Sequence, residues 1–330
     1  MGDVAKLAGV SPQTVSRVVN SREYVGGGTR ERVLTAMREL SYRPNRAAQA
    51  LVTGRSKTLG VISLETVAFG PASVLLGLER AAHAQGYLVS IARLASLDRG
   101  SLAQALEQLQ RQSVEGILLN AGQDAITHEL DRLPIDVPLV AVEDTPEAMV
   151  PIVMVDEVAG AAAATRLLLD LGHRNVAHIA GPRDWSPARR RVEGWRAVLE
   201  SAAVPVAPPL FGDWSVRSGY ELGRLLAQDR AVTAIFAAND EMALGVMRAM
   251  FEAGRELPRD VSIIGFDDVP FARYLTPPLT TVRQDFEEIG RRSVHLLLDA
   301  IRGGGDSSMR AAITPELVVR DSTGAAANRA

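Results

Sequence analysis

Short apolar segments alternate with amphipathic segments of helical length from Leu59 onward, and this pattern constrains the fold more than any other feature of the sequence. The expected strands are Leu59–Leu64, Leu88–Ala92, Gly116–Leu119, Leu139–Val142, Ile152–Val155, Val176–Ala180, Ala234–Ala237 and Val261–Phe266. The expected helices between them include Ala72–Gln85, Ala159–Leu171, Ala188–Ala202 and Glu241–Ala253. This alternation predicts parallel sheets with helices on both faces. So many strands favour two sheets, and therefore an α/β core of two lobes with a cleft between them.

Acidic and amide side chains follow three of the expected strands. Glu143-Asp144, Asn239-Asp240 and Asp267-Asp268 occupy these positions. Ligands of open α/β sheets bind beyond the carboxyl ends of the strands. These residues are therefore candidates for polar contacts in the cleft.

Residues 2–40 have a different pattern, that of three short amphipathic helices. A turn at Gly9-Val10-Ser11 separates the first two, with Ser11 as N-cap and Pro12 at the first helical position of a helix that extends to about residue 20. Thr29 is expected to cap the third helix. Two helices joined by a tight turn containing glycine are typical of a helix-turn-helix.

The second of these helices has one apolar and one polar face. Val15, Val18 and Val19 fall on one arc, and the opposite arc carries Gln13, Ser16, Arg17 and Asn20. Gln and Arg make bidentate contacts to adenine and guanine edges in DNA. A solvated helix face is the alternative interpretation, so the charge around the helix matters.

The charge of the chain is divided unevenly. Residues 1–58 contain ten Lys or Arg residues and four Asp or Glu residues, although the net charge of the whole chain is −3. A basic N-terminal segment on an acidic body favours a polyanionic partner. Residues 45–58 follow as a linker that can become helical, but Leu51 and Val52 are its only large apolar side chains. A helix this short needs a partner to order it.

Several classes of protein are disfavoured by the sequence. The chain has no cysteine and five scattered histidines, so neither a disulfide framework nor a metal site is expected. It shows no signal segment and no long apolar run, which predicts a cytoplasmic protein without membrane contact. No GxGxxG, P-loop or nucleophile–His–acid set is present, so we expect neither an enzyme nor a cofactor.

Specific blocks of the sequence resemble the lactose-repressor/galactose-repressor family over nearly the whole chain. They are DVAKLAGVSPQTVSRVVN (Asp3–Asn20), TRERVLTAMRELSYRPNRAAQAL (Thr29–Leu51), LGHRNVAHIAGP (Leu171–Pro182), GDWSVRSGY (Gly212–Tyr220), FAANDEMALGVMRAM (Phe236–Met250), VSIIGFDD (Val261–Asp268) and PPLTTVRQDFEEIG (Pro277–Gly290). The resemblance implies a homodimer that places two recognition helices in successive major grooves of a pseudo-palindromic operator. The leucine heptads of a tetramerising coiled coil are absent after Asp321, which also favours a dimer.

The resemblance also implies DNA-binding positions. They are Ser11, Pro12, Gln13, Thr14, Ser16, Arg17, Asn20, Thr29, Asn45, Ala48 and Leu51. Pro12, Gln13 and Arg17 match base-reading positions, and Leu51 matches a leucine that enters the minor groove and kinks the duplex. Gly26-Gly27-Gly28 stands where relatives carry polar phosphate-contacting residues, and we expect a loose loop there.

Positions for a small-molecule effector follow from the same resemblance. Arg191, Asn239 and Asp267 match residues that bind sugar hydroxyls, with Arg191 offering a fork of donors. The other expected contacts are Trp214 as an aromatic wall, Gln284 and Phe286 at the crossover between lobes, and Phe69 and Glu143 in the N-terminal lobe. Some of these features have structural alternatives: the tryptophans (Trp185, Trp195, Trp214) can be core residues. Arg189 and Arg190 are expected on a solvated helix face, and Asp240, Glu241 and Asp268 are expected to be structural.

The expected organisation is a helix-turn-helix domain (residues 1–44), a hinge helix and linker (45–58) and a two-lobed, periplasmic-binding-protein-like core (59–325). The N-lobe is expected at 59–155 and 286–312, and the C-lobe at 156–285 and 313–325. The predicted function is repression of sugar-utilisation genes, relieved when a mono- or disaccharide binds the cleft. A purine co-repressor is the alternative effector. A solute-binding protein shares the core but leaves the basic N-terminal segment unexplained.

Overall fold

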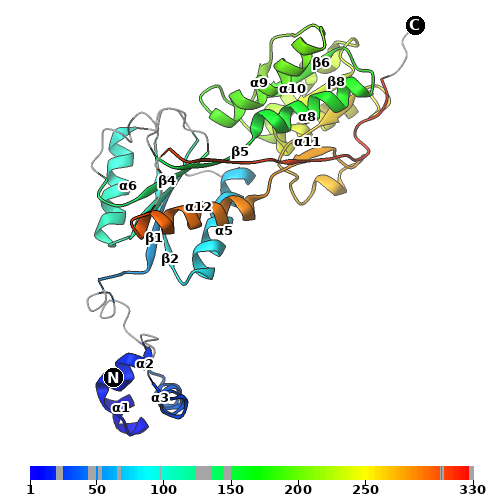
Figure 1. Ribbon diagram of the computed structural model, residues 1–330. Coiled ribbons are helices and arrows are strands. Elements are labelled where there is room, and N and C mark those ends of the chain that lie inside the picture. The colour runs from blue at the N-terminus through cyan, green and yellow to red at the C-terminus, as the bar shows by residue number, and fades with distance from the viewer. Residues whose placement is uncertain are drawn as a thin grey trace. The chain divides into compact units, whose positions relative to one another are not determined.

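The computed structural model describes residues 1–19, 25–43, 50, 54–64, 68–96, 98–122, 129, 135–143, 150–304, 306 and 308–326. Its internal contacts divide the chain into two compact units, Met1–Ser56 and Lys57–Ala330. We call them the head and the core (Figure 1).

The head contains the three helices that the sequence predicts, α1 (Gly2–Ala8), α2 (Pro12–Val19) and α3 (Gly27–Glu39). They enclose a small apolar cluster of Val4, Ala5, Ala8, Val15, Val18, Val33 and Ala36. Ser11 precedes α2 and its hydroxyl accepts the backbone N–H of Thr14 at 3.1 Å, as expected of an N-cap.

The expected cap of the third helix is wrong by three residues. Gly26 is the N-cap of α3 and Thr29 lies inside the first turn, where its N–H bonds to the Gly26 carbonyl at 2.9 Å. Glycine can adopt helical backbone angles, so the first turn of α3 begins before Thr29. Gly27 and Gly28 are thus helical rather than part of a loose loop.

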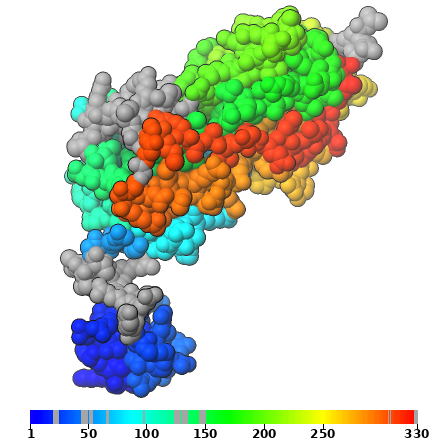
Figure 2. Space-filling model, in the orientation of Figure 1, coloured from blue at the N-terminus to red at the C-terminus, as the bar shows by residue number. Residues whose placement is uncertain are grey.

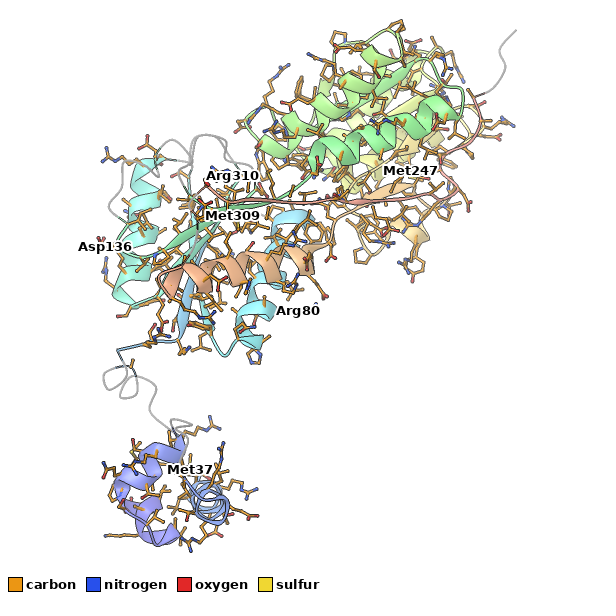
Figure 3. The ribbon with its side chains drawn as sticks, viewed as in Figure 1. Met37, Arg80, Asp136, Met247, Met309 and Arg310 are labelled. Carbon is orange, nitrogen blue, oxygen red and sulfur yellow. The ribbon has the colours of Figure 1, made fainter. Side chains whose placement is uncertain are left out.

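The first sheet of the core has six parallel strands in the order β11-β5-β4-β3-β1-β2. Their bounds are β1 Thr58–Leu64, β2 Leu88–Leu94, β3 Gly116–Asn120, β4 Leu139–Val142, β5 Ile152–Val155 and β11 Arg310–Ile313. Helices α5 (Phe69–Ala84) and α12 (Phe286–Ile301) cover one face, and α6 (Arg99–Arg111) covers the other (Figure 1). We call this sheet with its helices the N-lobe. On its surface, Arg80 of α5 reaches Glu287 of α12 at 2.8 Å (Figure 3).

The second sheet has four parallel strands in the order β7-β6-β8-β9. Their bounds are β6 Val176–Ala180, β7 Leu210–Phe211, β8 Ala234–Ala237 and β9 Ser262–Ile264. Helices α8 (Glu157–Asp170) and α9 (Ser186–Ser201) cover one face, and α10 (Val216–Gln228) and α11 (Asp240–Glu252) cover the other. A 3₁₀ turn, η1 (Ala272–Tyr274), follows β9. We call this assembly the C-lobe. Two parallel sheets with helices on both faces confirm the predicted α/β fold class.

The described chain passes between the lobes at three places, Val155–Glu157, Arg283–Phe286 and Ile313–Glu316. Beside the C-lobe, β10 (Thr281–Arg283) and β12 (Glu316–Val318) form an antiparallel pair. In the space-filling view the orange and red segments of these crossovers lie across the junction of the lobes (Figure 2).

Most elements begin close to where the sequence places them, and the differences have local causes. The four predicted helices start one to three residues early, because strand-end residues such as Asp156 and Asn239 act as N-caps. The strand expected at Val261–Phe266 is shorter, because Gly265 and Asp267 bond to Thr280 and Val282 of the β10 segment instead. No helix in the described residues is long and apolar enough to cross a membrane.

Candidate functional site

A cavity lies between the two lobes of the core, with about 740 Å³ of empty space that is partly open to solvent. It brings together all eight residues that the sequence suggests for ligand contact: Phe69, Glu143, Arg191, Trp214, Asn239, Asp267, Gln284 and Phe286. Glu143, Asn239 and Asp267 each follow a strand directly or within three residues, at β4, β8 and β9. The carboxyl ends of strands in both sheets therefore face one cavity.

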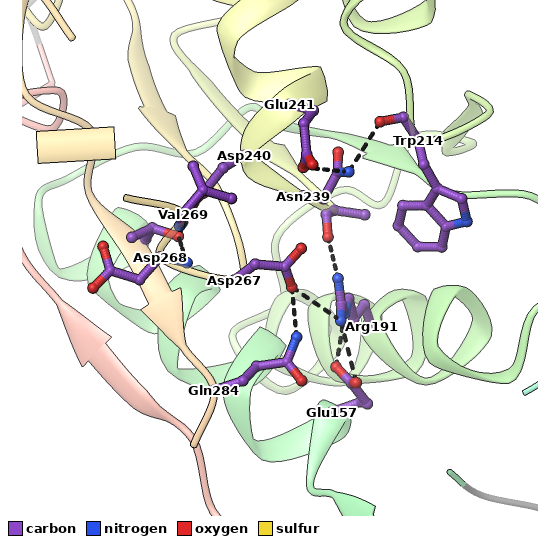
Figure 4. Close-up of polar contacts among 12 residues, drawn as sticks. Glu157, Arg191, Trp214, Asn239, Asp240, Glu241, Asp267, Asp268, Val269 and Gln284 are labelled. Atoms are coloured by element: carbon purple, nitrogen blue, oxygen red, sulfur yellow. Dashed lines mark hydrogen bonds and ion pairs between the residues drawn. The ribbon is translucent and has the colours of Figure 1, made fainter. Parts of the chain in front are cut away.

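Arg191 of α9 is the centre of the polar network (Figure 4). Its Nε donates to Glu157 Oε2 at 2.7 Å and its Nη2 donates to Glu157 Oε1 at 3.2 Å. Nη1 donates to the Ala238 carbonyl, and Nη2 lies 3.6 Å from Asp267 Oδ1. The guanidinium also lies 3.7 Å above the Phe266 ring. The fork that the sequence suggests for a ligand is thus already occupied by Glu157.

Sequence reasoning missed Glu157, although a signal for it existed. Glu157 is the first residue of α8, and it follows β5 at the same kind of strand end as the other candidates. Its carboxyl is buried beside Arg191, with 10% of its side chain exposed. A bidentate, buried carboxylate fixes the guanidinium in one orientation.

Asp267 and Asn239 are held in place by partners within the C-lobe. Asp267 accepts a hydrogen bond from Gln284 Nε2 and has a φ of 107°. Burial raises the pKa of Asp267 well above its ordinary value, although the nearby Arg191 acts in the opposite direction. Asn239 caps α11 by accepting the Met242 N–H at 2.9 Å, and its Nδ2 donates to the Trp214 carbonyl at 3.0 Å.

Trp214 forms an aromatic wall of the cavity. Its backbone has a φ of 73°, which a bulky residue adopts only when the surrounding structure holds it there. Its ring packs against Trp185 edge to face, with the ring centroids 5.8 Å apart. A side chain on Gly181 would overlap the indole, so this wall requires glycine at that position.

Glu143 is the acidic group that the N-lobe contributes to the cavity. Its φ is 97°, and its Oε2 is buried without a hydrogen-bond partner among the residues that the structure describes. Burial raises the pKa of Glu143 to about 8, and the charge of Glu157 acts in the same direction. A Cβ on Gly122 would overlap this carboxylate, so glycine at that position leaves the space that Glu143 occupies.

The remaining N-lobe contribution is apolar. Phe69 and Phe286 pack edge to face with their centroids 5.8 Å apart, and Phe69 also contacts the apolar core of the C-lobe. The Ser186 N–H donates to the Gly122 carbonyl at 3.0 Å, which joins α9 to the loop after β3. The lobes therefore meet around the cavity.

The sequence left open whether several residues bind a ligand or have a purely structural role. Trp195 is fully buried core, whereas Trp185 lines the cavity. Arg190 also lines the cavity, but 37% of its side chain is exposed beside Glu193, in agreement with the expected solvated position. Asp268 pairs with Arg283 at 2.7 Å and Arg320 at 2.6 Å, and Asp240 accepts from the Thr281 hydroxyl at 2.6 Å. Burial raises the pKa of Asp240 to about 7. Both aspartates are thus structural, as expected.

In the head, the exposed side of α2 carries Pro12, Gln13 and Arg17, while Thr14, Ser16 and Thr29 are half-buried. Ser11 lies at the exposed start of α2, where its hydroxyl is 2.9 Å from that of Thr14. The opposite side of α2 buries Val15 and Val18. The other expected DNA contacts (Asn20, Asn45, Ala48 and Leu51) lie outside the described residues. No group of metal-ligating side chains occurs in the described part of the chain.

Comparison with known proteins relates both units to one family. Residues 1–45 match the bacterial regulatory proteins of the lacI family, and residues 165–323 match a periplasmic binding protein-like domain. The chain is 35% identical over 328 residues to the HTH-type transcriptional repressor PurR of Haemophilus influenzae (strain PittEE), with 97% of each chain covered. The chain belongs to the lacI family. It is a transcriptional regulator with a helix-turn-helix head and a ligand-binding core, as the sequence predicts.

Other lacI-family members are similarly close. The lactose operon repressor of Klebsiella pneumoniae is 35% identical over 324 residues, which cover 97% of this chain and 91% of that protein. The structure of the lac repressor dimer bound to operator and the anti-inducer ONPF has a TM-score of 0.87 and 33% identity, with 98% of both chains covered. The complex of the regulator CelR with cellobiose has a TM-score of 0.73 and 33% identity, with 97% and 98% of the two chains covered.

Proposed function

We propose that this lacI-family regulator is a homodimeric repressor that binds operator DNA through its heads and is released when a sugar binds the interlobe cavity. The carrying observation is the buried cluster of Arg191, Asn239 and Asp267 against the Trp214 wall. Charged and amide groups that converge on one aromatic ring suit a sugar, which has hydroxyls at its edge and an apolar ring face.

Binding of operator DNA rests on α2. Gln13 and Arg17 are exposed on this helix, while its valines hold it against α1 and α3. The lac repressor of similar fold has been solved as a dimer on its operator. We propose that residues 1–44 read the major groove, that residues 45–58 with Leu51 form the hinge, and that the regulator acts in the cytoplasm, where bacterial DNA lies.

Control by the cavity follows from how the chain enters the core. The Lys57 N–H donates to Glu115 Oε1 at 2.7 Å, and Lys57 Nζ lies 3.2 Å from the Tyr87 hydroxyl. The linker therefore ends at the start of β1, an interior strand of the N-lobe sheet, and any shift of the N-lobe moves its end. A sugar that prefers one lobe arrangement changes the operator affinity by no more than its own differential affinity for the two arrangements.

A purine co-repressor is the second candidate effector. Four aromatic side chains line the cavity, since Trp185 joins Phe69, Trp214 and Phe286. Flat bases bind well between aromatic rings. Against this, the polar groups of the cavity are dominated by carboxyls and a buried guanidinium, which suit vicinal hydroxyls.

Effector binding is tested by calorimetric titration of the regulator with mono- and disaccharides, cellobiose among them, and with hypoxanthine and guanine. We expect one sugar to bind and to lower the affinity for an operator selected from random duplexes. Trp214→Ala and Asp267→Ala are expected to abolish that binding, while Glu221→Gln on the exposed side of α10 retains it. Binding of purines alone would overturn the sugar assignment and leave the DNA-binding role standing.

Operator binding has its own test. Arg17→Ala should relax the base preference of selected operators, with a loss of about 1–3 kcal/mol on the preferred sequence. Unchanged preference in this variant would contradict the role of α2.

A further inference from the structure

Carboxyl groups outnumber guanidinium groups in the lining of the cavity. Among its described lining residues, three carry carboxyls (Glu143, Glu157 and Asp267) and two carry guanidinium groups (Arg190 and Arg191). Arg190 donates to Glu193 at 3.1 Å on its own helix. The guanidinium of Arg191 therefore faces all three carboxyls.

Most of the hydrogen-bonding capacity of Arg191 is already used inside the C-lobe. Glu157 takes two of its N–H groups, the Ala238 carbonyl takes another, and Asp267 lies 3.6 Å from Nη2. Arg191 still acts electrostatically on Glu143, but Glu157 repels the same carboxylate. The N-lobe thus brings a further buried carboxyl to a cation that is already satisfied.

Glu143 is held in the cavity in spite of this repulsion. Its left-handed backbone is strained for a non-glycine residue, and strain of this kind persists only where the surroundings impose it. The absence of a side chain at Gly122 leaves room for the carboxylate, whose Oε2 has no partner among the described residues. An unsatisfied buried carboxyl at the wall of a ligand cavity indicates that a ligand supplies the missing partner.

The chemistry of the missing partner follows from the carboxyl group of Glu143. A ligand hydroxyl can hydrogen-bond to the protonated carboxyl but does not stabilise its ionised form, so Glu143 would keep its proton. An ammonium donates the hydrogen bond and also compensates the charge. A phosphate or carboxylate on the ligand would add to the repulsion. Trp214 still offers an aromatic face for a sugar ring.

We propose that the effector is a basic sugar, one that carries an amino group, and that its ammonium binds the Glu143 carboxylate. This inference rests on the proposed function, because it assumes that the cavity binds a sugar. Glu143 then determines specificity: it distinguishes an amino sugar from the neutral parent sugar and rejects sugar phosphates.

The test is calorimetric titration of the full-length regulator with matched sugars. The probes are glucosamine, galactosamine, mannosamine and the fully deacetylated chitosan dimer. Each is compared with its neutral parent, with its N-acetyl derivative and, for glucose, with the 6-phosphate. We expect one amino sugar to bind about ten- to a hundredfold more tightly than its parent, the range of one charge-assisted hydrogen bond.

Two variants separate the role of the charge from that of folding. Glu143→Gln keeps the shape of the side chain and should reduce the preference for the amino sugar to about onefold, without weakening the binding of the parent. Glu221→Gln removes one surface charge from the C-lobe and should leave the preference unchanged. A normal thermal unfolding transition in Glu143→Gln shows that the fold is retained.

Proton release gives a second readout that a purely structural role would not produce. The other charged or titratable groups that line the cavity are Glu157, Asp267, Arg190 and Arg191, and of these Glu157 and Arg191 act on the pKa of Glu143. Because the pKa of Glu143 is raised to about 8 in the free protein, an ammonium that binds at lower pH must displace its proton. Titration in buffers of different ionisation enthalpy should show about one proton released for wild type and none for Glu143→Gln.

Each outcome decides the proposal. A neutral sugar that binds as tightly as its amino derivative overturns the amino-sugar inference and leaves the sugar-effector function intact. Failure of every sugar in the panel, amino sugars included, overturns both. Preference for the amino sugar that persists in Glu143→Gln overturns the role of Glu143.

Discussion

The two lobes contribute to one cavity in opposite ways. The C-lobe presents polar side chains that are already bonded to one another: Glu157 to Arg191, Gln284 to Asp267, and Asn239 to the Trp214 backbone. The N-lobe presents two phenylalanines and Glu143, whose Oε2 has no hydrogen-bond partner in the described residues.

This difference separates two tasks of an effector site. A pre-bonded polar surface keeps its geometry without a ligand, and such preorganisation reduces the free-energy cost of binding. An unsatisfied group on the opposite wall gains a partner only when a ligand is present and the lobes are closed. The C-lobe is therefore suited to position the effector, and the N-lobe is suited to respond to it.

Among the variants that test this contrast, Glu157→Gln should have the largest effect on stability. It leaves the buried guanidinium of Arg191 without its bidentate anion, and breaking a buried pair costs about 3–5 kcal/mol. We expect urea unfolding of the core to show a loss of this size. The double variant Glu157→Met/Arg191→Met should lose less than the single one, because the buried guanidinium is removed together with its bidentate anion. Equal losses would show that the pair contributes only through packing.

Variants of two helix caps, one in each lobe, should have effects of intermediate size on stability. Asn239→Ala removes the cap of α11 and also the donor to the Trp214 carbonyl and the Glu241 carboxylate, so we expect a loss of about 2–4 kcal/mol. Asp285→Ala removes only the cap of α12 in the N-lobe and should cost about 1 kcal/mol. Chemical denaturation measures both. Similar losses would mean that the hydrogen bonds from Asn239 to Trp214 and Glu241 do not contribute to stability.

Glu143→Gln is expected to have the smallest effect on the free energy of unfolding. Unlike the other variants, it should stabilise the fold. Because the folded-state pKa of Glu143 is raised to about 8 from an ordinary value of 4.5, the folded protein retains a proton that the unfolded chain has lost in this window. The corresponding stability is fully present below pH 4.5 and is lost as the pH rises through 8.

Thermal melts at about pH 5.5 and 8.5 measure this effect, since the two values bracket most of the window. Wild type should lose stability on going to the higher pH, and Glu143→Gln should lose less. Asp240, with a pKa raised to about 7, contributes in the same direction, so part of the decrease remains in the variant. A steeper decrease of stability with pH in Glu143→Gln would contradict the interpretation of Glu143 as an unsatisfied buried carboxyl.

Most of the cavity was accessible from the sequence, but its internal pairing was not. The strand-end rule and the family resemblance identified Asn239, Asp267 and Glu143. Glu157 was missed and Trp185 was left open, because both become cavity residues only where α8 and α9 of the C-lobe begin beside the N-lobe. Thr29 was misplaced as a cap for a more local reason: glycines permit a helical turn that composition does not reveal.

The sequence by itself determined most of the elements, the two parallel sheets, the helix-turn-helix and the family, because hydrophobic periodicity and capping act over a few residues and specific motifs persist along the chain. Only the tertiary structure decided that the guanidinium of Arg191 is bonded on two sides to Glu157, a residue 34 positions away. It also decided that Glu143 is strained, buried and unsatisfied. Burial and charge pairing depend on which surfaces meet when the two lobes pack, and no local pattern encodes that.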